Sequence, residues 1–371
     1  MKIIVNKRDI TEILSRIQGI TGRRSGLAIT ENVLIKAEDA GITIVATDLE
    51  TGFRGNYPAT VESAGIMALN SRKFYEIAKE FPTEEITLQE VENRWIQIGN
   101  HKTIYRMVGT NPEDFPEIPR LEEGSYFDID SQEFNRMIDQ TIFIPAPSDN
   151  KRAHTNGVLF EKISEPKRII RMVSTDGSRL SCVDCEITTE FELPSGMSIL
   201  VPKSGLNEVR KILNDQETVQ VGFMRNHFIL KKAKETVLIR LLEGSFPKYQ
   251  DILEKSGSRQ VFINRQVFLM MLKRMSILSS DAYKGVVFNF TNGRLTIQTT
   301  NPDIGESKED MDINYDGPSI EAVFNPRFFI EILSVIDDED IILILISAEK
   351  PCYIEGNKDK RFISAIMPMR I

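Results

Sequence analysis

Few residues in this sequence have the types and spacing that chemistry requires. Cys182 and Cys185 have the CxxC spacing of a zinc or redox pair, but the chain has no second CxxC. If this segment is a strand, as its alternation suggests, the two thiols point to opposite faces. The other Cys and His residues that could bind a metal are scattered singly through the chain, as Cys352, His101, His154 and His227. We therefore expect no metal site.

Enzyme chemistry has two other candidates, and both are weak. The acidic run Asp337 to Asp340 could hold metal ions in a nuclease or polymerase, but it lies between an expected helix and an expected strand, where a solvated turn belongs. Ser178 has no histidine in a motif that would make it a base. The chain also lacks a phosphate-binding loop, a dinucleotide fingerprint, a nucleophile elbow and an HExxH motif. The sequence predicts neither a catalytic site nor a cofactor.

The elements that would position any site repeat three times along the chain. In each copy, an Asn or Asp in the N-cap position follows an apolar strand end and precedes apolar residues at helical spacing. The first helix of each copy is expected near residues 7–17, 133–141 and 265–275. The second is expected near residues 72–80, 203–211 and 327–333.

Between its two helices, each copy carries a pair of expected strands. The second strand runs into a turn in which an Asx side chain can bond its own backbone, beginning at Thr47, Thr175 and Thr300. Copies of about 120 residues, each with strands and two helices, indicate an α+β fold of three domains. We place these domains at residues 1–120, 126–250 and 256–371.

The bulk composition is that of a globular protein. Hydrophobic residues make up 41% of the 371 residues and charged residues 27%. The N-terminus turns polar after four apolar residues, and the apolar run at residues 341–346 is too short to span a bilayer. Three cysteines fit a reducing compartment, so we expect a cytoplasmic protein with no membrane partner.

Positive charge gathers on the repeated helices. The chain has a formal net charge of −8, whereas the six expected helices together carry +6. Basic residues are common on exposed helix faces, so this segregation alone leaves a nucleic-acid surface and an ordinary solvated surface equally open. A scaffold that never touches DNA also remains open at this point.

The chain resembles the bacterial DNA polymerase III beta subunits, the beta sliding clamps, over its whole length. The resemblance rests on short strings in a fixed order, which are residues 156–161, 175–180, 244–249 and 367–371 with Phe115-Pro116. It implies a non-catalytic processivity subunit. Two chains would form a homodimeric ring around duplex DNA, each contributing three clamp domains with sheets outside and two helices each inside.

The resemblance also implies which residues meet DNA. Cations on the helices would line the central hole and contact phosphates without reading bases. Those positions are Lys7, Arg8, Arg72, Lys73, Lys203, Arg210, Lys211, Arg265, Lys273 and Arg274. Loop cations at Arg24, Lys151 and Arg152 match further DNA contacts, although Ala153 and His154 replace aromatic residues common in the family.

A groove for partner peptides is implied between the second and third domains. The matching positions are Thr155, Thr175, Gly177, Ser178, Arg179, Leu180, Pro247, Ile252, Pro351, Ala365, Met367, Pro368, Met369 and Arg370. Methionines would receive the apolar anchor, and Arg179 and Arg370 would fix polar groups of the peptide. Two positions depart from the family, because Thr155 replaces an aliphatic residue and Asp251 stands where a basic residue is frequent.

Ring closure is implied between the first domain of one chain and the third domain of the other. The matching interface positions are Tyr105 and Met107 in the first domain and Ile277 and Leu278 in the third. The expected partners are duplex DNA, the alpha subunit of DNA polymerase III, the clamp loader delta subunit, and other polymerases and repair proteins with clamp-binding peptides.

Overall fold

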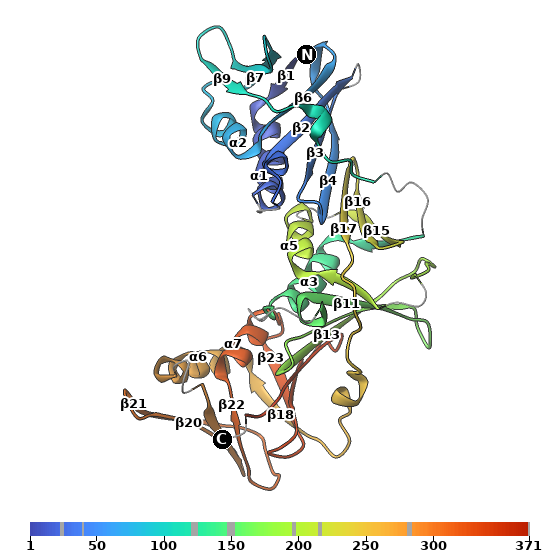
Figure 1. The fold of residues 1–371 in the computed structure, drawn as a ribbon. Helices are drawn as coiled ribbons and strands as arrows, with labels where there is room; N and C mark the ends of the chain where they lie inside the picture. The colour runs from blue at the N-terminus through green and yellow to red at the C-terminus, as the bar shows by residue number, and fades with distance from the viewer. Residues whose placement is uncertain are drawn as a thin grey trace. The chain divides into compact units, whose positions relative to one another are not determined.

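The structure is a computed structural model that describes residues 1–22, 26–38, 41–119, 125–146, 153–194, 198–213, 217–279 and 284–369 (Figure 1). The chain folds into two compact units. Unit 1 contains Met1–Asn135, Ile187–Gly196 and Val201–Leu241, and unit 2 contains Arg136–Glu186, Met197–Leu200 and Leu242–Ile371. These units partition the chain differently from the three expected domains, whose boundaries therefore stay a prediction.

Unit 1 is built on two sheets. The first has the strand order β5-β1-β7-β8-β9, formed by β5 (Thr60–Ser63), β1 (Lys2–Asn6), β7 (Glu85–Glu90), β8 (Trp95–Gly99) and β9 (Ile104–Val108). The second has the order β10-β15-β16-β17-β4-β3-β2-β6. Its strands are β10 (Tyr126–Asp130), β15 (Thr218–Met224), β16 (His227–Lys232), β17 (Glu235–Arg240), β4 (Thr51–Tyr57), β3 (Gly41–Thr47), β2 (Asn32–Glu38) and β6 (Gly65–Asn70).

Unit 2 is built on two further sheets. The larger has the order β14-β11-β12-β13-β25-β24-β23-β18. Its strands are β14 (Ile199–Pro202), β11 (Gly157–Ile163), β12 (Ile169–Thr175), β13 (Arg179–Glu186), β25 (Phe362–Ile366), β24 (Cys352–Gly356), β23 (Asp340–Leu345) and β18 (Arg259–Asn264). The smaller has the order β21-β20-β19-β22, formed by β21 (Gly305–Asp312), β20 (Arg294–Asn301), β19 (Val286–Thr291) and β22 (Ile320–Phe324).

All six expected helices are confirmed. They are α1 (Lys7–Thr21), α2 (Ser71–Glu80), α3 (Ser131–Ile142), α5 (Lys203–Ile212), α6 (Arg265–Met275) and α7 (Pro326–Ser334). A four-residue helix, α4 (Ala153–Asn156), was not expected. The helices pair within a unit, α1 against α2 and α6 against α7 (Figure 1). The expected α+β architecture is therefore present.

Capping and apolar spacing explain why the helices begin where they do. The Asn6 side chain accepts hydrogen bonds from the amides of Arg8 and Asp9, and Asn264 accepts one from Val267. The apolar positions of α1, including Ile13 and Ile17, are buried. Helices α1 and α6 thus satisfy first-turn amides locally, and α1 buries one face, whereas α5 begins at Pro202 without a side-chain cap.

The expected strand pairs and turns are also confirmed. In the three copies β2 pairs with β3, β11 with β12 and β19 with β20, all antiparallel. At the end of the second strand of each pair, an Asp or Asn side-chain oxygen accepts a hydrogen bond from the backbone N–H two residues later. These residues are Asp48, Asp176 and Asn301. These turns fix the register in which the next strand returns along the sheet.

Candidate functional sites

A groove of about 560 Å³ opens in unit 2. Eight of the expected positions line it: Thr175, Gly177, Arg179, Leu180, Ile252, Pro351, Ala365 and Met367. Asp251, which the sequence named as a departure from the family in this groove, also lines it, and the sequence did not predict six further lining residues, which are Glu254, Ser256, Ile346, Glu349, Lys350 and Tyr353. Segments nearly two hundred residues apart in the chain thus converge on one concave surface.

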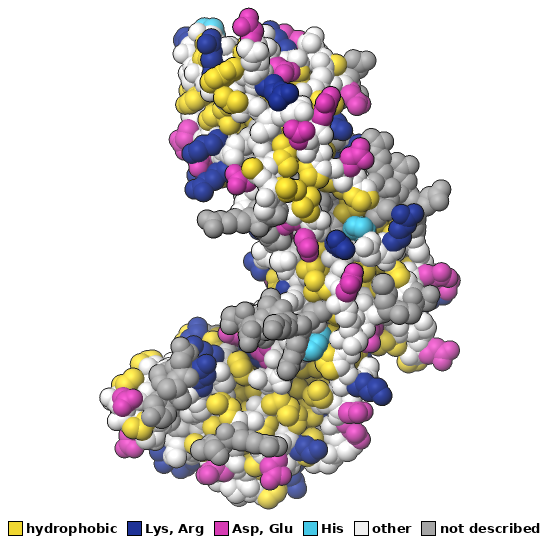
Figure 2. All heavy atoms as spheres, in the orientation of Figure 1, with side chains coloured by type: hydrophobic (Ala, Val, Ile, Leu, Met, Phe, Trp, Pro, Cys, Tyr) yellow, Lys and Arg dark blue, Asp and Glu magenta, His cyan; other side chains and the backbone are white. Residues whose placement is uncertain are grey.

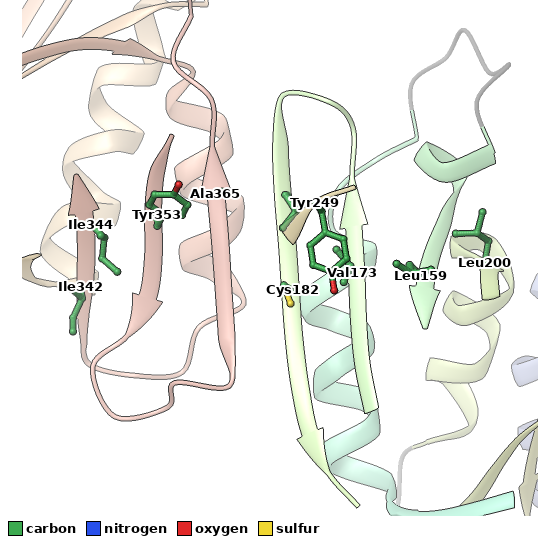
Figure 3. Packing of buried hydrophobic residues seen from close by; sticks show 10 residues of the cluster. Leu159, Val173, Cys182, Leu200, Tyr249, Ile342, Ile344, Tyr353 and Ala365 are labelled. Atoms are coloured by element: carbon green, nitrogen blue, oxygen red, sulfur yellow. The ribbon is translucent and has the colours of Figure 1, made fainter. Parts of the chain in front are cut away.

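The floor of the groove is a sheet junction. β13 pairs with β25, with Leu180 opposite Ala365. Both side chains are buried and belong to a core cluster that also contains Tyr249 and Tyr353. Figure 3 shows Tyr249 beside Val173 and Cys182 on one side of this cluster, and Tyr353 beside Ala365 on the other. A close-packed floor keeps the apolar wall of the groove preformed.

One wall is the segment around the 3-10 turn Gln250–Leu253, and several side chains hold it. The Tyr353 hydroxyl lies 2.8 Å from the carbonyl oxygen of Ile252 and 3.2 Å from that of Glu254. Burial raises the pKa of Tyr353, so the phenol stays protonated and donates. Lys255 forms an ion pair with Glu355 at 2.7 Å. The wall is therefore tied to the sheet at successive residues.

The same segment is anchored at Tyr249. The Tyr249 hydroxyl donates to a carboxylate oxygen of Glu161, and Arg171 forms a bidentate pair with Asp184 at 2.6 and 2.7 Å beside it. Burial and the bond to Glu161 raise the pKa of Tyr249. These polar groups satisfy one another on the sheet and leave the tyrosine ring to pack in the core.

Arg179 lies in the groove wall but is not free to bind a peptide directly. Its side chain is 1% exposed and forms ion pairs with Asp176 at 3.0 Å and Glu331 at 2.6 Å. Its guanidinium group also lies 4.2 Å from the ring centroid of Phe328. The expectation that Arg179 fixes polar groups of the peptide stays a prediction, and in this arrangement Arg179 stiffens the wall.

Five expected groove residues lie outside the lining, and one lies outside the described residues. Thr155 is buried on α4, and Pro247 is exposed on the surface. The Ser178 carbonyl oxygen accepts a hydrogen bond from the Met367 amide, with 2.9 Å between oxygen and nitrogen. Past Pro368, the Met369 amide donates to the Val323 carbonyl oxygen at 2.7 Å, which ties Met369 to β22. Arg370 is the position that the described residues do not include.

The expected DNA-contacting cations fall into several groups. Arg8, Arg72, Lys73, Arg210, Lys273 and Arg274 are exposed. Of these, Arg72 and Lys73 bond Glu76 at 3.1 and 2.8 Å, and Arg274 bonds Glu309. On the face drawn in Figure 2, basic side chains lie over α2 and α6 with acidic side chains beside them. Arg24, Lys151 and Arg152 lie outside the described residues.

Four other helix cations are buried or bonded within the protein. Lys203 is buried, so its expected contact with phosphate stays a prediction that this burial does not support. Lys7 donates to the carbonyl oxygen of Phe81, and Arg265 donates to those of Asp338 and Leu333. Lys211 pairs with the buried Glu208 at 2.7 Å. A basic residue on a helix is therefore a poor guide to a basic surface until its partners are known.

The strands follow one pattern that repeats three times. The runs β1-β7-β8-β9, β10-β15-β16-β17 and β18-β23-β24-β25 are equivalent, as are β6-β2-β3-β4, β14-β11-β12-β13 and β22-β19-β20-β21. The last strand of one run pairs with the last strand of another at β17·β4 and at β13·β25. Within the described residues, the equivalent strands β9 and β21 each end a sheet without such a partner.

These two edges carry the expected interface residues. Tyr105 and Met107 lie on β9, where Ile104 is 53% and Val108 62% exposed. Ile277 and Leu278 lie in the 3-10 turn Ser276–Leu278 that follows α6, and Ile277 is 74% exposed. Exposed apolar residues beside an unpaired strand edge are typical of a surface that another chain covers.

Metal ligands, apolar helices and cysteines are the remaining features to consider in the part of the chain that the structure describes. No cluster of three or more His, Cys, Asp or Glu residues there could hold a metal ion, and no helix there is long and apolar enough to cross a membrane. Cys182 and Cys185 are both buried on β13, and burial raises the pKa of Cys182 to about 12. A buried thiol of this kind is a poor nucleophile and a poor metal ligand.

Comparison with known proteins matches the chain to one family along its whole length. Family models of the DNA polymerase III beta subunit match its N-terminal domain at residues 1–119, its central domain at 128–248 and its C-terminal domain at 250–370. The chain is 27% identical to the beta sliding clamp of Pseudomonas aeruginosa and 26% identical to that of Chlamydia pneumoniae, with at least 99% of each protein covered.

Solved structures give the same answer. The sliding clamp of Bartonella birtlesii bound to griselimycin is 26% identical with a TM-score of 0.92, and the DNA polymerase III beta subunit of Pseudomonas aeruginosa is 26% identical with a TM-score of 0.89. Each comparison covers both chains completely. The three repeats thus belong to a known architecture of three domains, and the chain belongs to the family of DNA polymerase III beta subunits, the beta sliding clamps.

Proposed function

We propose that two copies of this protein close head to tail into a ring around duplex DNA and hold DNA polymerase III on its template. The observation that carries this proposal is the pair of unmatched strand ends, β9 and β21. A third junction of the kind already formed by β17·β4 and β13·β25 would join β9 of one copy to β21 of another. Two copies then leave neither β9 nor β21 without a partner, and each copy contributes three domains, at residues 1–120, 126–250 and 256–371.

The repeat also sets the register of the proposed junction. Val237 pairs with Phe53 at β17·β4, and Ser364 pairs with Ser181 at β13·β25. Following the strand pairings through each sheet, Tyr105 of β9 would lie opposite Ser307 of β21. Arg106 would then lie opposite Glu306, which sets unlike charges face to face. Ile277 and Leu278 complete the surface that is covered.

In this ring the six helices face the DNA. Arg8, Arg72, Lys73, Arg210, Lys273 and Arg274 would meet phosphates, joined by the loop cations Arg24, Lys151 and Arg152. Because phosphate contacts carry no sequence information, the ring can slide. The protein itself performs no chemistry, so its action consists of holding partners at DNA in the cytoplasm.

The groove of unit 2 is the proposed docking site for those partners. Its occupants would be short peptides of the alpha subunit of DNA polymerase III, the clamp loader delta subunit, and other polymerases and repair proteins. The preformed apolar wall with Leu180, Ile252 and Met367 suits an apolar anchor. A single small site per subunit lets many partners exchange on one ring.

Engineered cysteines test the junction directly. Arg106→Cys and Glu306→Cys in one chain should link through a short bifunctional thiol reagent, because the native cysteines Cys182, Cys185 and Cys352 are buried. The expected product on a denaturing gel is a closed species of two chains. Arg106→Cys alone should give only single chains. A link within one chain, or closed products of three or more chains, would contradict the proposed dimer.

A further inference from the structure

The groove carries an unbalanced set of charges at its rim. Asp251 and Glu254 are exposed on the wall formed by the 250–254 segment, and Glu349 is exposed on the loop that follows β23. The basic lining residues are Arg179, whose side chain is buried in ion pairs, and the exposed Lys350. Three exposed carboxylates therefore stand against one exposed ammonium group along the described lining.

These carboxylates have little to neutralise them. Among the described residues, no ion pair links Asp251 or Glu349 to a cation, and the Glu254 carboxylate accepts a hydrogen bond only from the neutral Ser256 hydroxyl at 3.1 Å. Lys255, between Glu254 and Ser256 in the chain, is taken up by Glu355. The negative charge at the rim is thus available to a ligand.

Two of the carboxylates stand on a backbone segment that is held in place. Asp251 and Glu254 flank Ile252 on the wall that the Tyr353 hydroxyl holds through the carbonyl oxygens of Ile252 and Glu254. The apolar side chain that would contact an anchor and the charges that would contact its neighbours therefore lie on one rigid segment. A peptide seated on Ile252 has to place its flanking residues beside a carboxylate.

We propose that this groove selects peptides in which basic residues flank the apolar anchor, and disfavours peptides with acidic flanks. The proposal rests on the proposed function of the groove and specifies the chemical class of its ligand. Charge complementarity at a partly exposed rim changes affinity modestly and is screened by salt, whereas a like-charge neighbour is penalised. The apolar wall would supply the affinity, and the rim would rank the partners.

The test uses two labelled peptides with one apolar anchor, flanked by two lysines in one and by two glutamates in the other. Fluorescence anisotropy with the full-length protein should show the lysine peptide bound about three- to tenfold more tightly at low salt, as expected for exposed pairs. The ratio should shrink towards one at about 0.5 M salt. The double variant Asp251→Lys, Glu254→Lys should reverse the order, while Glu165→Lys, an exposed carboxylate outside the groove, should not.

The outcomes distinguish this charge preference from the proposed docking function of the groove, on which it rests. If both peptides bind equally, or the glutamate peptide binds better, the charge preference is wrong while the groove remains a docking site. If neither peptide binds, or if binding survives Met367→Asp, the docking assignment itself fails and takes the preference with it. Arg370 is left unchanged throughout, so its charge is common to every measurement.

Discussion

β25 and β9 occupy the same position in the repeat, but the chain treats them differently. β25 lies between β24 and β13, and Ala365 and Ile366 on it are buried. β9 has a neighbour only at β8 within the described residues, and most of its side chains are exposed. The difference teaches that a repeat of three supplies two junctions from within and leaves β9 and β21 for the third, which the proposed function assigns to another chain.

The arginines beside these junctions differ in the same way. Arg16 on α1 and Arg274 on α6 are equivalent by the repeat. Arg16 pairs with Glu235 of β17, at 2.8 and 3.0 Å, across the β17·β4 junction, and the Tyr57 hydroxyl bonds the same carboxylate at 2.6 Å. Arg274 instead pairs with Glu309, on the free strand β21. The closed junction has a buried shared network, whereas the open edge has only a surface pair.

The largest expected effect is loss of the dimer when the open edge is blocked. Ile277→Asp with Leu278→Asp would place charges where apolar side chains are to be covered, and burying them unpaired is costly. Light scattering should then report folded single chains. The control Ile66→Asp, at an exposed apolar residue of unit 1 rather than unit 2, should leave the dimer unchanged. A double variant that still weighs two chains would move the interface elsewhere.

A large loss of stability is expected when the closed junction is broken at Glu235. The side chains of Arg16 and Glu235 are 17% and 10% exposed, so Glu235→Gln would leave a largely desolvated arginine without its counter-charge. The expected cost is about 2–4 kcal/mol, typical of a broken buried pair. Thermal unfolding of the variant at neutral pH, compared with Glu309→Gln, provides the measurement. Equal shifts in the two variants would contradict the contrast between closed and open edges.

The groove gives the next effect, and Met367 and Met369 offer a matched pair. Met367 lines the groove, whereas Met369 lies outside the lining, and the two are 41% and 39% exposed. Met367→Asp should weaken binding of an apolar-anchored peptide by about 30-fold, the size of an interface hot spot. Met369→Asp should change it by less than about threefold, as for an ordinary surface substitution. The reverse order in a titration would misplace the groove.

A smaller effect is expected at the helix cations. Arg210→Glu with Lys273→Glu should weaken retention on DNA and reduce the slope of log affinity against log salt by about one for each phosphate that the variant no longer neutralises. Lys234→Glu with Lys248→Glu changes the same charge at exposed positions outside the helices. If both double variants behave alike, the DNA surface is not made of these helices.

The smallest effect concerns the surface pair at the open edge. The hydrogen bond from Arg274 lowers the pKa of Glu309 below its ordinary value. The contribution of this carboxylate to stability is therefore present above its unfolded pKa of about 4.3 and is lost as the pH falls through the lowered folded pKa. An exposed pair contributes little to stability because solvent screens it. An NMR titration should show the Glu309 pKa rising in Arg274→Gln; an unchanged pKa would mean that the two side chains do not pair in solution.

The sequence predicted most of the fold because the signals are local. N-caps such as Asn6, apolar spacing in α1 and Asx turns such as Asp176 each act within a few residues, and their threefold recurrence reinforces the prediction. The groove was only partly predictable. Glu349 and Tyr353 reach it through the register of strands far apart in the chain, which no local pattern encodes. Lys203 shows the same limit, since its type predicts exposure and its place at the start of α5 buries it.

The most direct test of the proposed ring is topological. The protein would be loaded onto a nicked circular duplex, separated from free protein by gel filtration, and the DNA then cut once with a restriction enzyme. A ring held by encirclement should co-elute with the circle and leave the linear form by sliding off its ends. The Ile277→Asp, Leu278→Asp variant should fail to co-elute with either. Equal retention on circular and linear DNA, or none on the circle, would contradict a ring closed through β9 and β21.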